Sequence, residues 1–426
     1  PLTFTLPAHV AISLLLGIYK GGTYGGSISA ILINTPGTPA AAATILDGYP
    51  LARQGKAGKA LYMALFASVF GDALSIFILM AVAQPLASIA LMFGPPELFA
   101  LLLFALTVIG GLSGESLFKG FISACFGLML ATIGTDTITG DTRFTFSLLY
   151  FEDGLSIIPM IIGLFAISEV FQQMRHVGEA QAETLLPPPS CPDDNRVTRR
   201  EFFASLPIFI QASLIGVSIG ALPGTGSTTA AYLSYGAAKR RSKHPELFGK
   251  GSLEGVAAAE AGNNAVCGGA LIPMLSLGIP GDVVTAILMG ALTVHGIIVG
   301  PSIFVEHRTF IFTIFSMLLI SIFMLLLLGH AAIRSCRLLA NLPQARIMPM
   351  VMVLRVLGSF ATNLSVNDIW LMLVIGRAGL FMNALGIPIA PLVIGFVLAP
   401  KLEQSLRQAL ILSDGSYGIF LTRPIA

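Results

Sequence analysis

Long apolar segments alternate with short polar ones along almost the whole chain. A helix needs about 20 consecutive apolar residues to cross a bilayer, and many of these segments reach or approach that length. The pattern therefore predicts an all-α integral membrane protein that is polytopic, with roughly nine to eleven crossings. The longest apolar segments cover residues 60–83, 97–112, 117–134, 154–174, 202–222, 283–300, 310–333, 345–362 and 366–385.

Glycine and proline interrupt three further hydrophobic segments, at 25–46, 223–238 and 257–279. Irregular backbone is tolerated inside a membrane only where protein or a cavity surrounds it, so these segments predict broken or re-entrant helices. Two of them share one pattern, in which a Gly-Gly pair precedes a Pro-Gly pair. The pairs are Gly25, Gly26 with Pro36, Gly37, and Gly268, Gly269 with Pro280, Gly281. Matching interruptions in two halves of a chain are typical of the binding sites of secondary transporters.

A polar, proline-rich stretch at 175–201 divides the chain into two predicted halves. We interpret 1–174 as a first membrane repeat, 175–201 as an aqueous linker and 202–426 as a second membrane repeat. A third Pro-Gly segment at Pro223 has no counterpart upstream of Pro36, so we expect the first repeat to be truncated at its N-terminus. The hydrophobic end of the chain suggests a C-terminal truncation of the second repeat.

The distribution of basic residues predicts how the two repeats are oriented. The loop after the first Pro-Gly segment carries Arg53, Lys56 and Lys59, whereas the equivalent loop at 295–302 has no lysine or arginine. Basic loops stay on the cytoplasmic side of a membrane. Equivalent loops are therefore expected on opposite faces, which is the arrangement of an inverted repeat.

Composition supports the membrane interpretation and excludes several other classes. Hydrophobic residues make up 55% of the chain and charged residues only 11%, against about 25% charged residues in soluble domains. A net charge of +2 gives no reason to expect a nucleic-acid partner. The chain has no GxxxxGK[ST] run for nucleotide hydrolysis and no paired Ser and His at a convincing spacing, so we expect no enzyme. The four cysteines form neither a disulfide framework nor a metal site.

The Pro-Gly segments carry the chemistry expected for binding an anion. Asn34 and Thr35 suit a helix N-cap, Pro36 suits the first helical position, and alanines follow Gly37. A helix N-terminus inside the membrane would attract a carboxylate through its free N–H groups and its dipole. A second segment repeats this design with Pro223, Gly224, Thr225, Gly226 and Ser227. The competing interpretation is that these segments are only kinks and close-packing glycines.

A coupling ion is expected beside the same segments. Unwound backbone at Gly25, Gly26, Gly268 and Gly269 would expose carbonyls that hold a sodium ion. Glu260 and Asp72 are acidic residues within apolar segments, where they are costly and often functional, although a structural pairing is equally compatible with the sequence. Asp47 and Asp136 are expected near the membrane interfaces, in solvated or capping roles.

Several phrases together resemble the large permease subunit of the tripartite tricarboxylate transporters. They are Tyr24-Gly25-Gly26-Ser27 through Asn34-Thr35-Pro36-Gly37, then Asp47-Gly48-Tyr49-Pro50, and Glu260-Ala261-Gly262-Asn263-Asn264-Ala265 through Gly278-Ile279-Pro280-Gly281. The likeness covers essentially the whole chain. It implies a multi-pass protein of a bacterial inner membrane that works with a small membrane subunit and an extracytoplasmic solute-binding protein. It also implies symport of citrate or related carboxylates with an ion gradient. Two parts expected in the family, an N-terminal Pro-Gly segment and a final hydrophobic span, are absent here.

The residues and the resemblance together define the predicted site. The predicted substrate-binding residues are Ser27, Asn34, Thr35, Pro36, Gly37, Pro223, Gly224, Thr225, Gly226 and Ser227. The predicted ion-coupling residues are Gly25, Gly26, Glu260, Asn263, Asn264, Gly268, Gly269, Pro280 and Gly281. No cofactor is expected beyond a sodium ion or a proton. Two alternatives stay open: a stand-alone carboxylate carrier that needs no binding protein, and a membrane scaffold that transports nothing.

Overall fold

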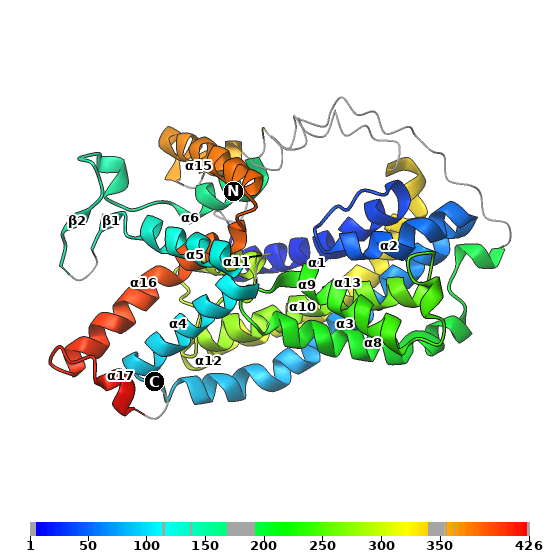
Figure 1. The fold of residues 1–426 in the computed structure, drawn as a ribbon, viewed down its shortest axis with the longest axis horizontal. Helices are drawn as coiled ribbons and strands as arrows, with labels where there is room; N and C mark the ends of the chain where they lie inside the picture. The colour runs from blue at the N-terminus through cyan, green and yellow to red at the C-terminus, as the bar shows by residue number, and fades with distance from the viewer. Residues whose placement is uncertain are drawn as a thin grey trace.

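The computed structural model describes residues 6–112, 116–136, 139–167, 192–339, 353, 356–361 and 363–423. This part of the chain is almost entirely helical, with one two-stranded antiparallel ribbon, β1 (Gly134–Thr135) and β2 (Thr142–Arg143) (Figure 1). The main helices are α1 (Ala8–Ile33), α2 (Ala41–Leu51), α3 (Ala57–Ala90), α4 (Pro95–Leu112), α5 (Leu117–Ala131), α6 (Ile157–Ile161), α8 (Arg199–Gly220), α9 (Gly226–Arg241), α10 (Leu253–Leu277), α11 (Val283–Val294), α12 (Ile303–Glu306), α13 (Arg308–Leu339), α15 (Val366–Ala384), α16 (Ile389–Leu412) and α17 (Ile419–Thr422). Short turns of other helix types lie at Ala52–Lys56, Leu149–Phe151, Ile162–Ile167, Pro192–Asn195 and Pro245–Leu247.

Helix α10 is the centre of the larger group of helices. It packs against α3, α8, α9 and α2, and nearly all of its side chains are buried (Figure 1). Its sequence is rich in alanine and glycine, and small residues let membrane helices approach closely. A Cβ placed on Gly71 of α3 would collide with the carbonyl of Ala261, and one placed on Gly216 of α8 would collide with the carbonyl of Gly262. These glycines therefore set the spacing of the core.

A second group contains α4, α5, α15 and α16. Helix α16 packs against α5 and α4, while α15 packs against the turn Ile162–Ile167. A Cβ on Gly127 of α5 would collide with the carbonyl of Leu392, so glycine again permits the close crossing. Helix α11 contacts α1 and α10 of the first group and α16 and α6 of the second, and it joins the two groups.

The apolar surface of the helices is that of an integral membrane protein, as predicted. Within the described residues four helical stretches are long and apolar enough to cross a bilayer: Ala41–Ala90, Asp193–Gly220, Arg308–Ser335 and Ile389–Leu412. Shorter apolar helices cover Pro95–Val108, Leu117–Ala131 and Val283–Val294. Large apolar side chains such as Phe104 and Phe323 are 61% and 70% exposed, which suits contact with lipid. Most of the predicted span 345–362, and residues 168–174 of the span 154–174, lie outside the described residues.

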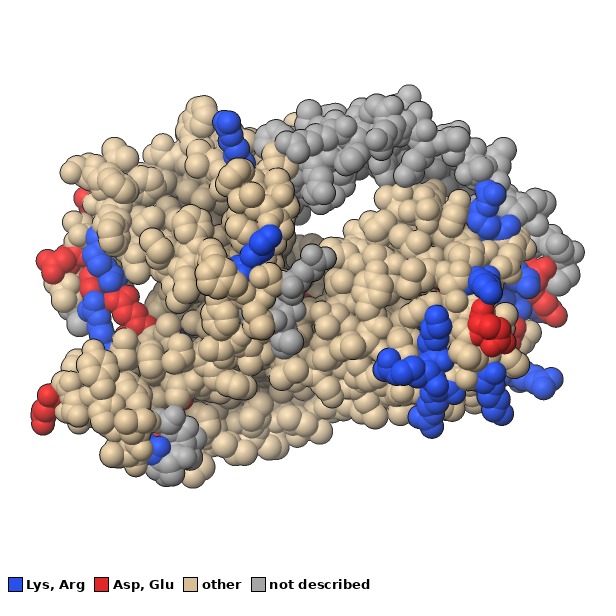
Figure 2. Space-filling view, in the orientation of Figure 1, with Lys and Arg blue, Asp and Glu red and all other residues tan. Residues whose placement is uncertain are grey.

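Basic side chains gather at one end of the larger helix group. Figure 2 shows them at the right end, where α2, α8 and α9 end or begin. Two contacts show that segments distant in sequence meet there: Gln54 Nε2 donates to the carbonyl of Lys250 at 2.8 Å, and Lys59 of α3 pairs with Glu201 of α8 at 2.7 Å. The opposite end carries acidic and basic residues together (Figure 2). The exposed basic residues of the first end include Arg53, Arg196, Arg199, Arg200, Lys239, Arg240, Arg241, Lys243 and Lys250.

The two predicted halves interleave in space. Helix α3 of the first half packs along α10 of the second, and α4 and α5 of the first half pack on α16 of the second. The division into two repeats and their inverted relation stay predictions, and most of the predicted linker, residues 175–191, lies outside the described residues.

Candidate functional site

The carboxylate of Glu260 is the centre of a polar cluster at the junction of four helices. Its Oε1 accepts hydrogen bonds from Ser27 Oγ at 2.5 Å and from Thr44 Oγ1. Its Oε2 accepts from Ser68 Oγ at 3.1 Å and from Asn264 Nδ2 at 3.4 Å. These residues come from α1, α2, α3 and α10, and Glu260 is 0% exposed. We call this group of five residues the Glu260 cluster.

The Glu260 cluster combines a carboxylate with neutral donors only. No lysine or arginine of the described residues bonds to it. A buried carboxylate is costly unless a positive charge or a proton compensates it. The side-chain Oδ1 of Asn264 is also buried without a partner in the described part of the chain. Carboxylate, hydroxyl and amide oxygens are the ligands that hard cations prefer. The cluster can therefore hold either a proton or an alkali cation.

Asn263, next to this cluster, has a different environment. It is 0% exposed, and neither its Nδ2 nor its Oδ1 has a hydrogen-bond partner within the described residues. Residues three and seven positions apart share a face of a helix, so Asn263 lies on the side of α10 that carries Val266 and Ala270. Gly281 of the third Pro-Gly segment packs directly on Ala270. An unsatisfied buried amide is rare in native proteins and indicates a place where a ligand or water binds.

The first Pro-Gly turn folds back against α1. Helix α1 ends at Asn34, whose φ of 55° is left-handed, a conformation that asparagine tolerates at a helix C-terminus. The amide of Gly37 donates to the carbonyl of Gly26 at 3.1 Å. A Cβ on Gly37 would lie 2.7 Å from the Cα of Gly26, so the two glycines permit this backbone contact. The turn is thereby placed beside Ser27 and the Glu260 cluster.

Two expectations for this region are wrong. Asn34 ends α1 and does not cap the next helix, because α2 begins only at Ala41, after a turn. The backbone does not unwind at Gly25 and Gly26, because α1 runs unbroken from Ala8 to Ile33. Gly26 serves instead for close packing, and its carbonyl receives the Gly37 amide.

The second Pro-Gly turn joins α8 to α9 and meets the third. Gly224 has a φ of 81°, and its amide donates to the carbonyl of Gly281 at 2.7 Å. Thr225 precedes α9, but its hydroxyl donates back to the carbonyls of Ile219 and Leu222 at 2.6 and 3.0 Å and does not cap α9. The predicted hydroxyl ligand at Thr225 is therefore engaged, while Ser227 lies in the first turn of α9.

The third Pro-Gly turn follows an unbroken α10. The predicted break between 257 and 279 is wrong, because α10 continues to Leu277 and ends at Gly278 in a left-handed conformation. Gly268 and Gly269 lie within the helix and pack against Ser75 of α3 and Val217 of α8. Their carbonyls are therefore not freed by unwinding. After Pro280 and Gly281, Asp282 caps α11 by accepting from the amide of Thr285 at 2.8 Å.

Two acidic residues are more buried than the sequence predicted. Asp47 is 0% exposed, and its Oδ1 accepts from the amides of Gly249, Gly251 and Ser252 at 2.8, 2.9 and 2.8 Å. Asp136 is 4% exposed and is bound by both terminal nitrogens of Arg407 at 3.2 and 2.7 Å. The solvated role is wrong for both, since a partner segment distant in sequence replaces water, whereas the capping alternative fits Asp47, which accepts the amides just before α10.

The sequence interpretation missed a buried ion pair. Lys20 Nζ lies 2.9 Å from Asp72 Oδ2, and the two side chains are 3% and 1% exposed. Lys20 interrupts the apolar sequence of α1, and this interruption is the signal that could have revealed it. The pair lies on the same side of α1 as Thr23 and Ser27, one and two turns away.

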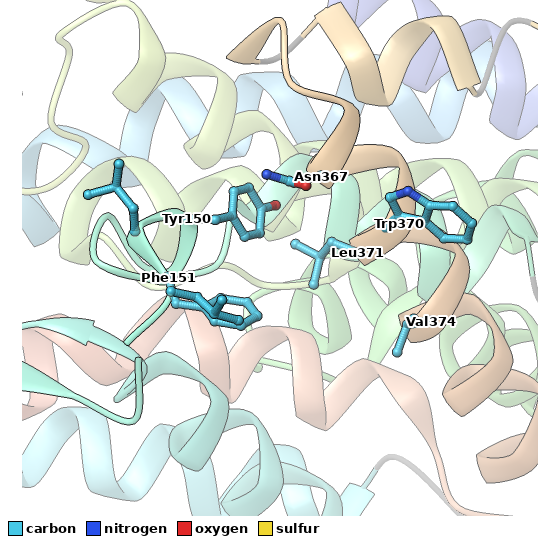
Figure 3. Close-up of a pocket in the computed structure, with 8 residues that line it drawn as sticks. Tyr150, Phe151, Asn367, Trp370, Leu371 and Val374 are labelled. Atoms are coloured by element: carbon cyan, nitrogen blue, oxygen red, sulfur yellow. The ribbon is translucent and has the colours of Figure 1, made fainter. Parts of the chain in front are cut away.

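A cavity of about 450 Å³ lies elsewhere, between the segment 148–151 and α15 (Figure 3). Its lining is largely apolar, with Phe151, Leu371 and Trp370 around the opening. Tyr150 Oη donates to Asp368 Oδ1 at 2.6 Å and so is already engaged. None of the lining residues belongs to α1, α3 or α10, so this cavity is separate from the Glu260 cluster.

Fold and site together define a helical, polytopic membrane protein whose core brings Pro-Gly turns together with buried polar side chains. Interrupted segments with polar groups in the core are typical of secondary transporters. The chain belongs to the tripartite tricarboxylate transporter TctA family, whose model matches residues 1–394.

Two relatives from Agrobacterium vitis extend this comparison. An uncharacterized 52.8 kDa protein in the TAR-I ttuC' 3' region is 37% identical over 100% of this chain and 84% of its own length. An uncharacterized protein in the TAR-II ttuC' 3' region is 35% identical over 50% of this chain and 87% of its own length. No solved structure matches the chain. Membership of the family indicates the large subunit of a tripartite tricarboxylate transporter and points to transport without catalysis.

Proposed function

We propose that this chain is the permease through which tricarboxylates or related carboxylates enter a bacterial cell, driven by an ion gradient. It acts with a small membrane subunit and an extracytoplasmic solute-binding protein, as the family name implies. One observation carries the proposal: the fully buried Glu260 carboxylate, bonded to neutral donors from four helices beside a Pro-Gly turn. A buried carboxylate destabilises a membrane protein, so it is expected where it serves a function such as ion binding and not in a scaffold.

The substrate carboxylates bind near the Pro-Gly turns. Helices α2 and α9 begin directly after the first and second Pro-Gly turns, and a helix N-terminus attracts negative charge. The residues proposed for this contact are Gly37 and its neighbours in the first turn, and Gly224 to Ser227 in the second. Asn263 supports the assignment, because its unpartnered amide can donate to a carboxylate oxygen.

The coupling ion binds at the Glu260 cluster. A sodium ion would be held by the Glu260 carboxylate together with the hydroxyls of Ser27, Thr44 and Ser68 and the Oδ1 of Asn264; a proton would neutralise Glu260 directly. Alternating access then moves this core against the second helix group. The basic end of the larger group faces the cytoplasm of a bacterial inner membrane, since basic loops are retained on that side.

Uptake measurements test the proposal. Cells express the permease with its small subunit, with and without the binding protein, and accumulation of labelled citrate and several dicarboxylates is followed with and without sodium. We expect uptake that requires the binding protein and an ion gradient. Glu260→Gln should abolish it, whereas Glu246→Gln, at a carboxylate with 62% exposure, should not.

Each result bears on a specific part of the proposal. Uptake that persists without the binding protein would favour the stand-alone carrier. Membrane insertion without uptake of any carboxylate under any gradient would favour the scaffold. Uptake by the Glu260→Gln variant at the wild-type rate and with wild-type ion dependence would remove the Glu260 cluster from the coupling site.

A further inference from the structure

The ion pair between Lys20 and Asp72 holds three helices together in the core. Lys20 Nζ donates to Asp72 Oδ2 on α3 at 2.9 Å, to Ser321 Oγ on α13 at 2.7 Å and to the carbonyl of Leu318 at 3.2 Å. An ammonium has three N–H donors, and all three are used here. Lys20 is also the only buried lysine or arginine among the described residues.

Only one of the two carboxylate oxygens of Asp72 has a hydrogen-bond partner within the described residues. Its Oδ1 is buried and has no hydrogen-bond partner within the described residues. Ser75 Oγ donates to the backbone carbonyl of Asp72 and not to Oδ1. An open carboxylate oxygen in a dry core is costly as it stands, and a proton placed on it removes the charge.

Few other ionisable groups face Asp72 from the helices packed around α3. Helix α1 brings Lys20 and Tyr19. Helix α10 brings Cys267, which lies within electrostatic range of Lys20, Asp72 and Asp282, and Glu260, which bonds to Ser68 one turn from Asp72 on α3. Helix α13 contributes only the neutral groups that bond to Lys20. The ionisable residues of α8 and α2 lie near the basic end of the group, at Arg199, Arg200, Glu201, Asp47 and Tyr49.

The pair is connected to the third Pro-Gly turn. Tyr19, which precedes Lys20, donates from its Oη to Asp282 Oδ2 at 2.8 Å, and Asp282 directly follows Gly281. On the other side, Thr23 Oγ1 lies 3.7 Å from Cys267 Sγ, one turn before Ser27 of the Glu260 cluster. Lys20 therefore lies between the Glu260 cluster and the third Pro-Gly turn, which the second turn contacts through the bond from the Gly224 amide to the Gly281 carbonyl.

We propose that Asp72 is a proton-binding site whose protonation frees Lys20 to bind a carboxylate of the substrate. A proton from the outer side adds to Asp72 Oδ1 and gives the neutral acid, while Lys20 keeps its own three protons. The attraction between the two side chains then falls, and the ammonium pairs with the substrate carboxylate instead. On the cytoplasmic side Asp72 releases the proton and recaptures Lys20, so that the substrate leaves.

This mechanism makes proton binding and substrate binding favour each other. Lys20 is buried and needs an anion, and Asp72 and the substrate compete for it. Neutralising one competitor raises the affinity of the other, and this coupling is reciprocal. Asp72 and Glu260 also differ in chemistry: the Glu260 carboxylate is surrounded by hydroxyl and amide oxygens that suit a cation, whereas Asp72 offers one open oxygen, which suits a proton.

The test uses the complete transporter, permease with small subunit and binding protein, in proteoliposomes. The inference rests on the proposed carboxylate uptake, which is measured with labelled citrate at fixed sodium, with and without an inward proton gradient. We expect the gradient to stimulate wild-type uptake about tenfold, within the usual range of coupling energies. Asp72→Asn should remove this stimulation. Ser75→Ala, which changes only a bond to the backbone of residue 72, should keep it.

A double variant covers the case in which Asp72→Asn fails to fold because Lys20 is left unpaired. Lys20→Met with Asp72→Asn removes both charges at nearly constant volume. Its citrate uptake should be far below wild type, because the proposed carboxylate ligand is gone, and the remaining uptake should show no stimulation by the proton gradient. Stimulation at the wild-type level in either variant would overturn the proposal.

Infrared spectroscopy gives a second readout that does not depend on transport. As the pH is lowered, both proteins gain absorption from protonated carboxyl groups, and subtracting the Asp72→Asn spectrum from the wild-type spectrum should leave a band from Asp72. Identical pH-dependent carboxyl spectra of the two proteins would also overturn the proposal. Wild-type protein without uptake under any gradient would refute the proposed function, while the infrared band would still decide whether Asp72 takes up a proton.

Discussion

Neighbouring glycines in α1 allow a sharp test of the first Pro-Gly turn. Gly25 is exposed, and a Cβ added there meets nothing within 4 Å. A Cβ added to Gly26 would lie 2.7, 2.8 and 2.9 Å from Oγ1, the backbone N and Cγ2 of Thr38. The two alanine substitutions are chemically identical, so any difference between them reports on the contact between α1 and the turn.

The expected changes in stability for these two substitutions follow from helix propensity and from packing. Gly→Ala within a helix is worth about 0.5–1 kcal/mol of stability when nothing opposes it, and this gain is expected for Gly25→Ala. At Gly26 the turn must retreat by about 0.6 Å to restore ordinary contact with Thr38. Overpacking of this kind costs about 1–3 kcal/mol, which offsets or exceeds the gain. Because the backbone of the turn moves, the amide of Gly37 also loses its bond to Gly26.

Two measurements separate the outcomes. Thermal unfolding in detergent should show Gly25→Ala at or above wild-type stability and Gly26→Ala at or below it. Uptake of labelled citrate by the complete transporter should be near wild type for Gly25→Ala and reduced at least about tenfold for Gly26→Ala, since small displacements of a binding group have large effects. Equal uptake by the two variants would refute the assignment of the Pro36–Gly37 turn to the substrate site.

Three further predictions concern the buried polar groups and the core. Asn264→Ala should lower the free energy of unfolding by about 1–3 kcal/mol, because Asn264 Nδ2 bonds to Ser68 Oγ at 2.8 Å. Asn263→Ala breaks no bond among the described residues. It should instead weaken citrate binding, as measured by isothermal titration. Asp47→Asn should lower the free energy of unfolding by about 1.5–3 kcal/mol, because three backbone amides lose a charged acceptor. As a control, Asp193→Asn at an exposed carboxylate should change it by less than about 0.5 kcal/mol. Gly71→Ala should reduce the yield of folded protein, because the added Cβ would collide with the carbonyl of Ala261. Gly17→Ala should not reduce it, because a Cβ there meets nothing within 4 Å. Equal yields of the two variants would contradict this packing.

The chain's class and its special segments could be predicted from the sequence. The scarcity of charge requires a lipid environment, and the structure confirms an all-α membrane protein. The Pro-Gly pairs were found because proline and glycine act locally, through φ and through the missing Cβ. The distinctive phrases around Asn34 and Glu260 also identified the family, which the comparison confirms.

Local patterns did not reveal where helices end. Gly25, Gly26, Gly268 and Gly269 look like sites of unwinding when the sequence is taken alone. In the structure they stay helical, because Gly26, Gly268 and Gly269 pack against Thr38, Ser75 and Val217. A glycine in a membrane helix is compatible with both a break and a close crossing, and only the neighbouring helix decides between them.

The partners of the buried charges were decided by tertiary structure alone. Glu260 and Ser27 are 233 residues apart, Asp47 and Gly249 are 202 apart, and even Lys20 and Asp72 are 52 apart. The sequence showed that a charge within an apolar segment needs compensation. Which group supplies it depends on the crossing geometry of several helices, because hydrogen bonds and ion pairs require contact within a few ångströms. Composition therefore determined the environment of this protein, and helix packing determined where its charges meet.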